Sequence, residues 1–274
     1  MRTILPSCST WKISNGSISL YRLCQIIYME YSNFERYGYL YLEDFFPEAL
    51  LQSLEGIICP FHERWMAANE AGYRNGLINS HSLTSDNALT AEERLALFRF
   101  LSQDRILEIV KAVFPGKALF LNTQLFFDPS DGTQPNYWHR DIQYTGLSRE
   151  EQQMNIESRN VVHFRIPLRP EAGIEVIPGT HRIWDLPEEE AVRLSLNGHK
   201  PSDALQRGLA IPLKRGDLLV FSANMVHRGL YGGDRFAFDI IFCDDTPEFS
   251  NFIDLRNHPS GEELAFLNPA VFMS

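Results

Sequence analysis

Short runs of β-branched and aromatic residues, interspersed with regularly placed polar side chains, recur throughout the chain after residue 117. The clearest run is RFAFDIIF, residues 235–242, in which successive side chains of a strand would point to opposite faces. One face would carry only large apolar side chains: Phe236, Phe238, Ile240 and Phe242. The other face carries Arg235 and Asp239, yet the strand is too hydrophobic overall to be an exposed edge. We therefore expect helices to cover the apolar face.

Polar residues recur at the same alternation in two further strand-like runs. Asn122 and Gln124 share one face of LFLNTQLFF, and His163 and Arg165 share one face of VVHFRIPL. Burying polar groups costs free energy unless they find partners, so a purely structural core would not require this pattern. The sequence therefore predicts that several strands present polar groups to one interior cavity.

The first half of the chain has a different, mainly helical character. A short strand over residues 38–46 is followed by Pro47, a residue favoured in the first turn of a helix, and by helical spacing to Gly72. Thr90 and Glu93 form a capping-box pattern that opens one or two helices ending near residues 115–116. Another helix is expected over residues 187–198. The predicted architecture is helices packed on an antiparallel sandwich or jelly roll.

Composition excludes several classes of protein. A formal net charge of −10 argues against a surface that binds nucleic acid, because phosphate backbones require basic side chains. No run of 18 apolar residues is present, so we expect no membrane span. The chain has four scattered cysteines, Cys8, Cys24, Cys59 and Cys243, and none forms a Cys-x-x-Cys pair. This pattern is typical of free thiols in the cytoplasm. Residues 1–28 lack clear periodicity and are expected to be a weakly ordered extension of one domain spanning residues 29–274.

The run NYWHRD places His139 and Asp141 two positions apart, and FSANMVHRG places His227 where the strand opened by residues 216–217 is expected to end. Non-haem Fe(II) oxygenases hold iron with two histidines and one carboxylate on one side, leaving positions open for co-substrate and O2. Arg235 begins the next strand on its polar face, where a guanidinium can grip a carboxylate with two hydrogen bonds. Each signal is weak by itself, but their order and spacing together favour an iron site.

These segments resemble one known family. The motifs YWHRD, GIEVIPGTHRIWD and GDLLVFSANMVHRGLYGGDRFAFDIIF, with the opening NFERYGYLYLEDFFPEALLQSL, are similar in content and order to the phytanoyl-CoA dioxygenase family of Fe(II)/2-oxoglutarate oxygenases. The resemblance implies a mainly β, α+β fold with a double-stranded β-helix (cupin-like) core and N-terminal helices on its major sheet. It also implies Fe(II) held by His139, Asp141 and His227, O2 as oxidant, and 2-oxoglutarate anchored by Arg235.

Two positions refine what the resemblance implies. Family members often carry serine or threonine two positions after the distal histidine, but this chain has Gly229 there. Another polar group must then assist 2-oxoglutarate, and the candidates are Asn122, Gln124 and Thr180. Related halogenases have a small residue in place of the carboxylate ligand, so Asp141 favours hydroxylation or a related oxidation. The predicted reaction is hydroxylation of an unactivated C–H bond, with release of succinate and CO2.

The substrate is expected to be a small molecule. Candidate residues around it are Tyr137, Trp138, Tyr144 and Arg165, although each is also compatible with packing or ion pairing. The polar segments 128–137 and 143–160 are expected to be loops that cover the site. Two other functions stay open: a cupin-like protein that binds a metal or small molecule without turnover, and a metal-dependent hydrolase or isomerase that gives Arg235 no special task.

Overall fold

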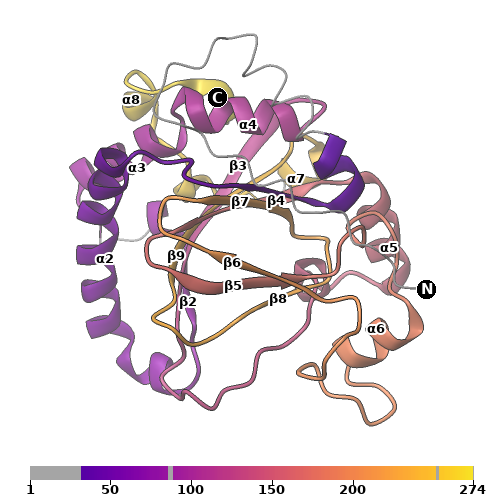
Figure 1. Cartoon of the computed structure of the whole chain (residues 1–274). Helices are drawn as coiled ribbons and strands as arrows, with labels where there is room; N and C mark the ends of the chain where they lie inside the picture. Colours follow the sequence, from indigo (N-terminus) through magenta and orange to yellow (C-terminus); the bar gives the residue numbers. More distant parts are fainter. Residues whose placement is uncertain (1–31, 86–88, 251–252, 274) are drawn as a thin grey trace.

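A computed structural model describes residues 32–85, 89–250 and 253–273 (Figure 1). The extension expected over residues 1–28 lies outside these residues. Within these ranges, nine strands form two antiparallel sheets. In order across the six-stranded major sheet, the strands are β1 (Tyr39–Leu42), β7 (Leu218–Ser222), β4 (Val161–Pro167), β9 (Phe236–Asp244), β3 (Ala118–Phe127) and β2 (Asn79–His81). The three-stranded minor sheet has the order β6 (Leu209–Leu213), β5 (Glu171–Val176) and β8 (His227–Gly229).

Helices cover the outside of this sandwich. In chain order they are α2 (Glu48–Arg74), α3 (Ala91–Leu101), α4 (Asp104–Val113), α5 (Arg149–Ser158) and α6 (Pro187–Arg193), with the single-turn α7 (Pro247–Ser250) and α8 (Gly261–Leu264) near the C-terminus. The capping box of Thr90 and Glu93 opens α3, as expected. In Figure 1, α2, α3 and α4 lie along one side of the major sheet, and the minor sheet lies across its other side. The fold is therefore the expected jelly roll with N-terminal helices on the major sheet.

Alternation along the central strands separates two environments. Phe236, Phe238 and Phe242 of β9 pack with apolar residues of α2, α3 and α4 in the largest core cluster. A second, smaller cluster between the sheets joins β5 and β6 to Leu219 and Phe221 of β7. Because neighbouring residues of a strand face opposite ways, the polar residues of β4 and β9 point away from the helices and into the space between the sheets.

Four expectations about local structure were wrong. The strand predicted over residues 38–46 ends at Leu42, and Pro47 is the N-cap of α2 rather than its first residue. The strand opened by residues 216–217 ends at Ser222, so His227 does not end it but begins β8 in the other sheet. The polar segment 143–160, expected to be a loop, contains α5, whose capping box of Ser148 and Glu151 is an S-x-x-E pattern.

The aromatic packing on the helix side of the major sheet is expected to carry much of the stability. Phe164 of β4 is fully buried in the large core cluster. Its ring packs edge-on against the Phe242 ring, with the ring centroids 5.0 Å apart. We expect Phe164→Ala to lower the free energy of unfolding by about 3–5 kcal/mol, because the cavity left behind cannot fully collapse. Phe266, which is 65% exposed, is the matched control. Phe266→Ala should change the free energy of unfolding by less than about 0.5 kcal/mol. Urea denaturation measures both, and similar values for the two variants would contradict this account of the core.

Candidate active site

Backbone pairing brings the two histidine segments together. His139 and His227 form an isolated antiparallel bridge, in which each backbone N–H donates to the other residue's carbonyl oxygen at 2.9 Å. Asp141 N–H donates to Ala223 O at 3.1 Å, so the second half of the motif is tied to the turn that precedes β8. The side chains of all three residues therefore converge from two segments that are distant in sequence, as the motif predicts.

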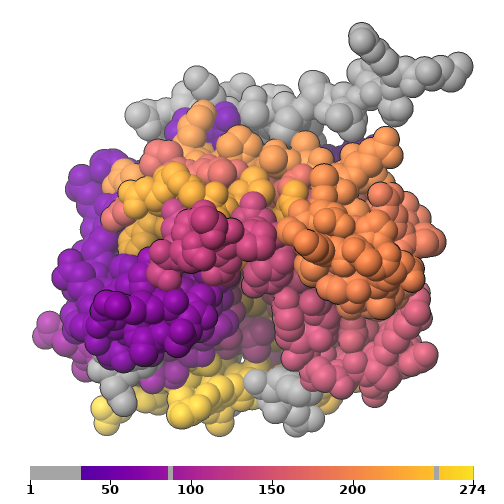
Figure 2. Space-filling model, turned by 90° about the horizontal axis from the view of Figure 1, so that it is seen from below, coloured from indigo at the N-terminus to yellow at the C-terminus, as the bar shows by residue number. Residues whose placement is uncertain are grey.

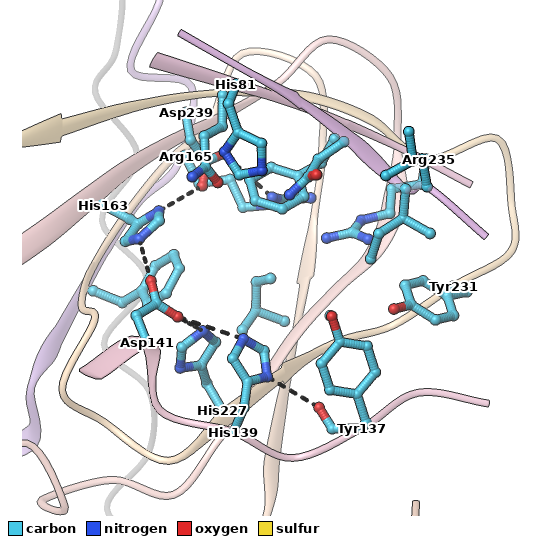
Figure 3. A pocket seen from close by; sticks show the side chains of 18 of the residues that line it. His81, Tyr137, His139, Asp141, His163, Arg165, His227, Tyr231, Arg235 and Asp239 are labelled. Atoms are coloured by element: carbon cyan, nitrogen blue, oxygen red, sulfur yellow. Dashed lines mark hydrogen bonds and ion pairs between the residues drawn. The ribbon is translucent and has the colours of Figure 1, made fainter. Parts of the chain in front are cut away.

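The three side chains have the geometry of a metal site (Figure 3). One ligand atom from each of His139, Asp141 and His227 lies within 4.8 Å of the others. Asp141 Oδ1 is 3.5 Å from the Nε2 atoms of both histidines. The Nδ1 atom of His139 faces Tyr137 O at 3.1 Å, and that of His227 faces Met225 O at 2.8 Å. Each Nδ1–H can donate to a carbonyl oxygen, which leaves the Nε2 lone pair of each ring directed at Asp141.

Electrostatics favour the protonation states that a cation needs. Burial lowers the pKa of His139 and lowers that of His227 to about 3, so both rings are neutral near pH 7. Burial opposes ionisation of Asp141, but the hydrogen bond from His163 holds its pKa well below the usual range. Neutral imidazole and ionised carboxylate are the forms that bind divalent metals. Two histidines and one carboxylate on one side of the cavity fit Fe(II) with open positions.

Arg235 lies immediately before β9 and points into the same cavity (Figure 3). It is 3% exposed, and its Nε and Nη1 atoms have no hydrogen-bond partner among the described residues. The guanidinium carbon lies 5.0 Å from the Phe126 ring centroid and 5.4 Å from that of Tyr231. Burial and the nearby Arg165 lower the pKa of Arg235 to about 10, so it stays charged near pH 7. A buried cation with free donors fits a carboxylate ligand.

Gly229 leaves room for this arginine. A Cβ atom at position 229 would lie 2.6 Å from Arg235 Nη2 and 3.0 Å from its Cζ atom. A serine or threonine there would force the guanidinium to move. The departure from the family pattern is therefore coupled to the present position of Arg235.

The other candidate residues separate into two groups. Gln124, Tyr137, Tyr144 and Arg165 line the cavity. Thr180 does not, because its hydroxyl donates to Ile177 O and accepts from Val226 N. Trp138 packs in a separate apolar cluster and donates through Nε1 to Asp203 O. Asn122 follows a β-bulge in β3 and is not among the cavity-lining residues. Both residues lie after the bulge, so Asn122 shares one face of β3 with Gln124 as the alternation predicted, although Gln124 lines the cavity and Asn122 does not.

Arg165 is already paired within the site. It forms a two-pronged ion pair with Glu171, at 2.8 and 3.1 Å, and donates to Asp239 Oδ1 at 3.2 Å. The other oxygen of Asp239 lies 3.0 Å from His163 Nδ1. Both groups are buried, so this part of the cavity wall is a closed set of ion pairs.

Sequence reasoning did not assign a role to several residues of the cavity, whose volume is about 550 Å³. His163 contacts Asp141 directly, and its inward position in β4 was visible from alternation, but nothing in the sequence showed its partner. Asn79 and His81 come from β2, a three-residue strand too short to predict. Tyr231 adds a further aromatic wall. In Figure 2 the surface is hollowed between the purple segment of the N-terminal half and the pink and orange segments that follow.

Within the described ranges, no helix combines the length and apolar character that crossing a bilayer requires. The chain matches the model of the phytanoyl-CoA dioxygenase (PhyH) family over residues 34–230. A search of curated proteins gave no match.

Solved structures with the same fold include HygX from Streptomyces hygroscopicus, with nickel and 2-oxoglutarate bound, at 15% identity and a TM-score of 0.59, covering 79% of this chain and 86% of that one. EctD from S. alaskensis, solved with 2-oxoglutarate and 5-hydroxyectoine, is 15% identical with a TM-score of 0.52. The match covers 87% of this chain and 80% of EctD. AviO1 from Streptomyces viridochromogenes Tue57 is 17% identical with a TM-score of 0.55. The match covers 80% of this chain and 95% of AviO1. With the family match over most of its length and a two-histidine, one-carboxylate site beside a buried arginine, the chain belongs to the phytanoyl-CoA dioxygenase family of Fe(II)- and 2-oxoglutarate-dependent oxygenases.

Proposed function

We propose that this protein hydroxylates an unactivated C–H bond of a small molecule, using Fe(II), 2-oxoglutarate and O2, with release of succinate and CO2. One observation carries the proposal: His139, Asp141 and His227 converge in the cavity that also holds the guanidinium of Arg235, whose Nε and Nη1 atoms have no partner among the described residues. A metal site alone would not require a buried arginine with free donors. A co-substrate with two carboxylates accounts for both features, because one end can reach the metal and the other the arginine.

Each residue has a distinct task in this proposal. His139, Asp141 and His227 would hold Fe(II), which with bound 2-oxoglutarate supplies the oxidising power for the C–H bond. Arg235 would bind the distal carboxylate, and Tyr137 and Tyr231 form the wall beside it (Figure 3). Excluding water from this end strengthens the ion pair, because charges interact more strongly at low dielectric. Asp141 also favours hydroxylation over halogenation, since its carboxylate occupies the position that halogenases leave free.

The rest of the cavity suits a small-molecule substrate. A volume of about 550 Å³ falls within the range of ligand sites. Its walls combine aromatic side chains, such as Phe126 and Tyr144, with the hydrogen-bonding groups of Asn79, His81 and Gln124. This mixture favours a substrate that has both apolar and hydrogen-bonding parts. EctD, solved with 5-hydroxyectoine, shares the fold and provides an example in which a hydroxylated small molecule is bound.

Loss of one metal ligand should abolish turnover. We expect His139→Ala to eliminate succinate formation from 2-oxoglutarate in protein supplied with Fe(II) and O2, because two remaining ligands hold the metal poorly. His199 is an exposed histidine outside the cavity, so His199→Ala should retain wild-type succinate formation. Mass spectrometry of succinate gives the measurement. Wild-type rates in His139→Ala would refute the iron site, whereas wild-type protein that binds Fe(II) without forming succinate would favour a non-catalytic cupin-like binding protein.

Removing the guanidinium should weaken co-substrate binding more than metal binding. We expect Arg235→Leu to raise the dissociation constant of 2-oxoglutarate at least about 30-fold in Ni(II)-loaded protein, the effect of losing about 2 kcal/mol from a buried charge pair. Ni(II) affinity should change little, because Arg235 is not a ligand. Arg169→Leu removes a 47% exposed arginine side chain paired with Asp234 and is the matched control. Calorimetric titration measures the dissociation constants of both Ni(II) and 2-oxoglutarate. An unchanged dissociation constant of 2-oxoglutarate in Arg235→Leu would contradict the proposal that Arg235 binds its distal carboxylate.

A further inference from the structure

His163 bridges two carboxylates in the wall of the cavity (Figure 3). Its Nε2 atom lies 2.9 Å from Asp141 Oδ2, and its Nδ1 atom lies 3.0 Å from Asp239 Oδ2. Carboxylate oxygens are acceptors, so an imidazole between two of them is satisfied when both of its nitrogens carry a proton and donate. His163 is only 3% exposed, which leaves little access for water to replace either partner.

The ring is also fixed from the side. The Phe221 ring stacks on it with centroids 4.9 Å apart and planes 18° from parallel. Asp239 cannot move away easily, because its other oxygen accepts from Arg165, which is in turn gripped by both oxygens of Glu171. Asp141 is thus the end of a continuous buried chain of ion pairs that runs through β4 and β9 to the start of β5.

The two oxygens of Asp141 have different surroundings. Oδ1 faces the Nε2 atoms of His139 and His227, each at 3.5 Å. Oδ2 faces away from them and meets His163. A carboxylate held in this way can offer Oδ1 alone to a metal, because turning Oδ2 toward the metal would break a charge-assisted hydrogen bond.

We propose that His163 is a positioning residue, which donates to Asp141 Oδ2 and so fixes Asp141 as a ligand through Oδ1 only. The inference rests on the proposed function only in taking His139, Asp141 and His227 as the metal ligands. It assigns a task to the polar face of β4, and it explains why a chain of ion pairs is buried beside the site. Holding the carboxylate to one oxygen preserves open positions on the metal for a co-substrate that binds through two atoms.

The test compares two histidine-to-phenylalanine variants. His163→Phe keeps an aromatic ring against Phe221 but removes both donors. His258→Phe makes the same change at a buried histidine that packs against Phe120 and Phe272, outside the cavity. Metal-free protein is titrated with Co(II) by calorimetry, and the visible spectrum of each Co(II) form is recorded. We expect His163→Phe to bind Co(II) about 10–100-fold more weakly than wild type and to change the spectrum, whereas His258→Phe should match wild type in both.

A second pair of variants separates the hydrogen bond from general loss of structure. His163→Gln keeps an N–H that can reach Asp141, and His163→Met fills a similar volume without a donor. The Gln variant should bind Co(II) more tightly than the Met variant, even if His163→Phe does not fold. Equal affinity and identical spectra in wild type and in the Gln and Met variants would overturn the inference. Wild-type protein that passes this test but forms no succinate would refute the proposed hydroxylase and leave the role of His163 standing.

Discussion

The backbone bridge between His139 and His227 is the interaction on which the site depends. It joins the loop after β3 to the start of β8 through two hydrogen bonds of 2.9 Å. It holds His227 beside the segment that carries His139 and Asp141, although the two segments are far apart in the chain. The bridge is made by main-chain atoms, so it tolerates variation of the neighbouring side chains. The side chains that it aligns are then free to specialise in metal binding.

Charge is distributed unevenly around the cavity. On one side, every charged group has a partner in a closed chain of ion pairs. The chain consists of Asp141, His163, Asp239, Arg165 and Glu171. On the other side, Arg235 is buried and its Nε and Nη1 atoms lack partners within the described residues. An unpaired buried charge is costly, which supports the proposal that an anion binds on the second side. In the proposed function, the first side would orient the metal ligand and the second would bind the co-substrate.

Much of this protein follows from local patterns. Alternation in residues 235–242 predicted which side of β9 packs on helices, and the large core cluster has that composition. The spacing of His139 and Asp141, with His227 and Arg235 far along the chain, identified four residues that all line one cavity. Alternation predicts the face of a strand, but it does not predict which residues of that face reach the cavity. Asn122 keeps its predicted face of β3 but does not line the cavity, and the capping box at Ser148 opens α5 where a loop was expected.

The sequence by itself determined which side chains can bind a metal, which face of each strand is polar and the class of fold. These properties are local, because they depend on residue chemistry and on alternation along a strand. Only the tertiary structure decided which polar groups pair with one another. Arg165 and Arg235 are both inward-facing arginines in the sequence, yet one is neutralised by Glu171 and Asp239 while the other keeps free donors. That distinction depends on which strands meet across the two sheets, and no short stretch of the chain contains this information.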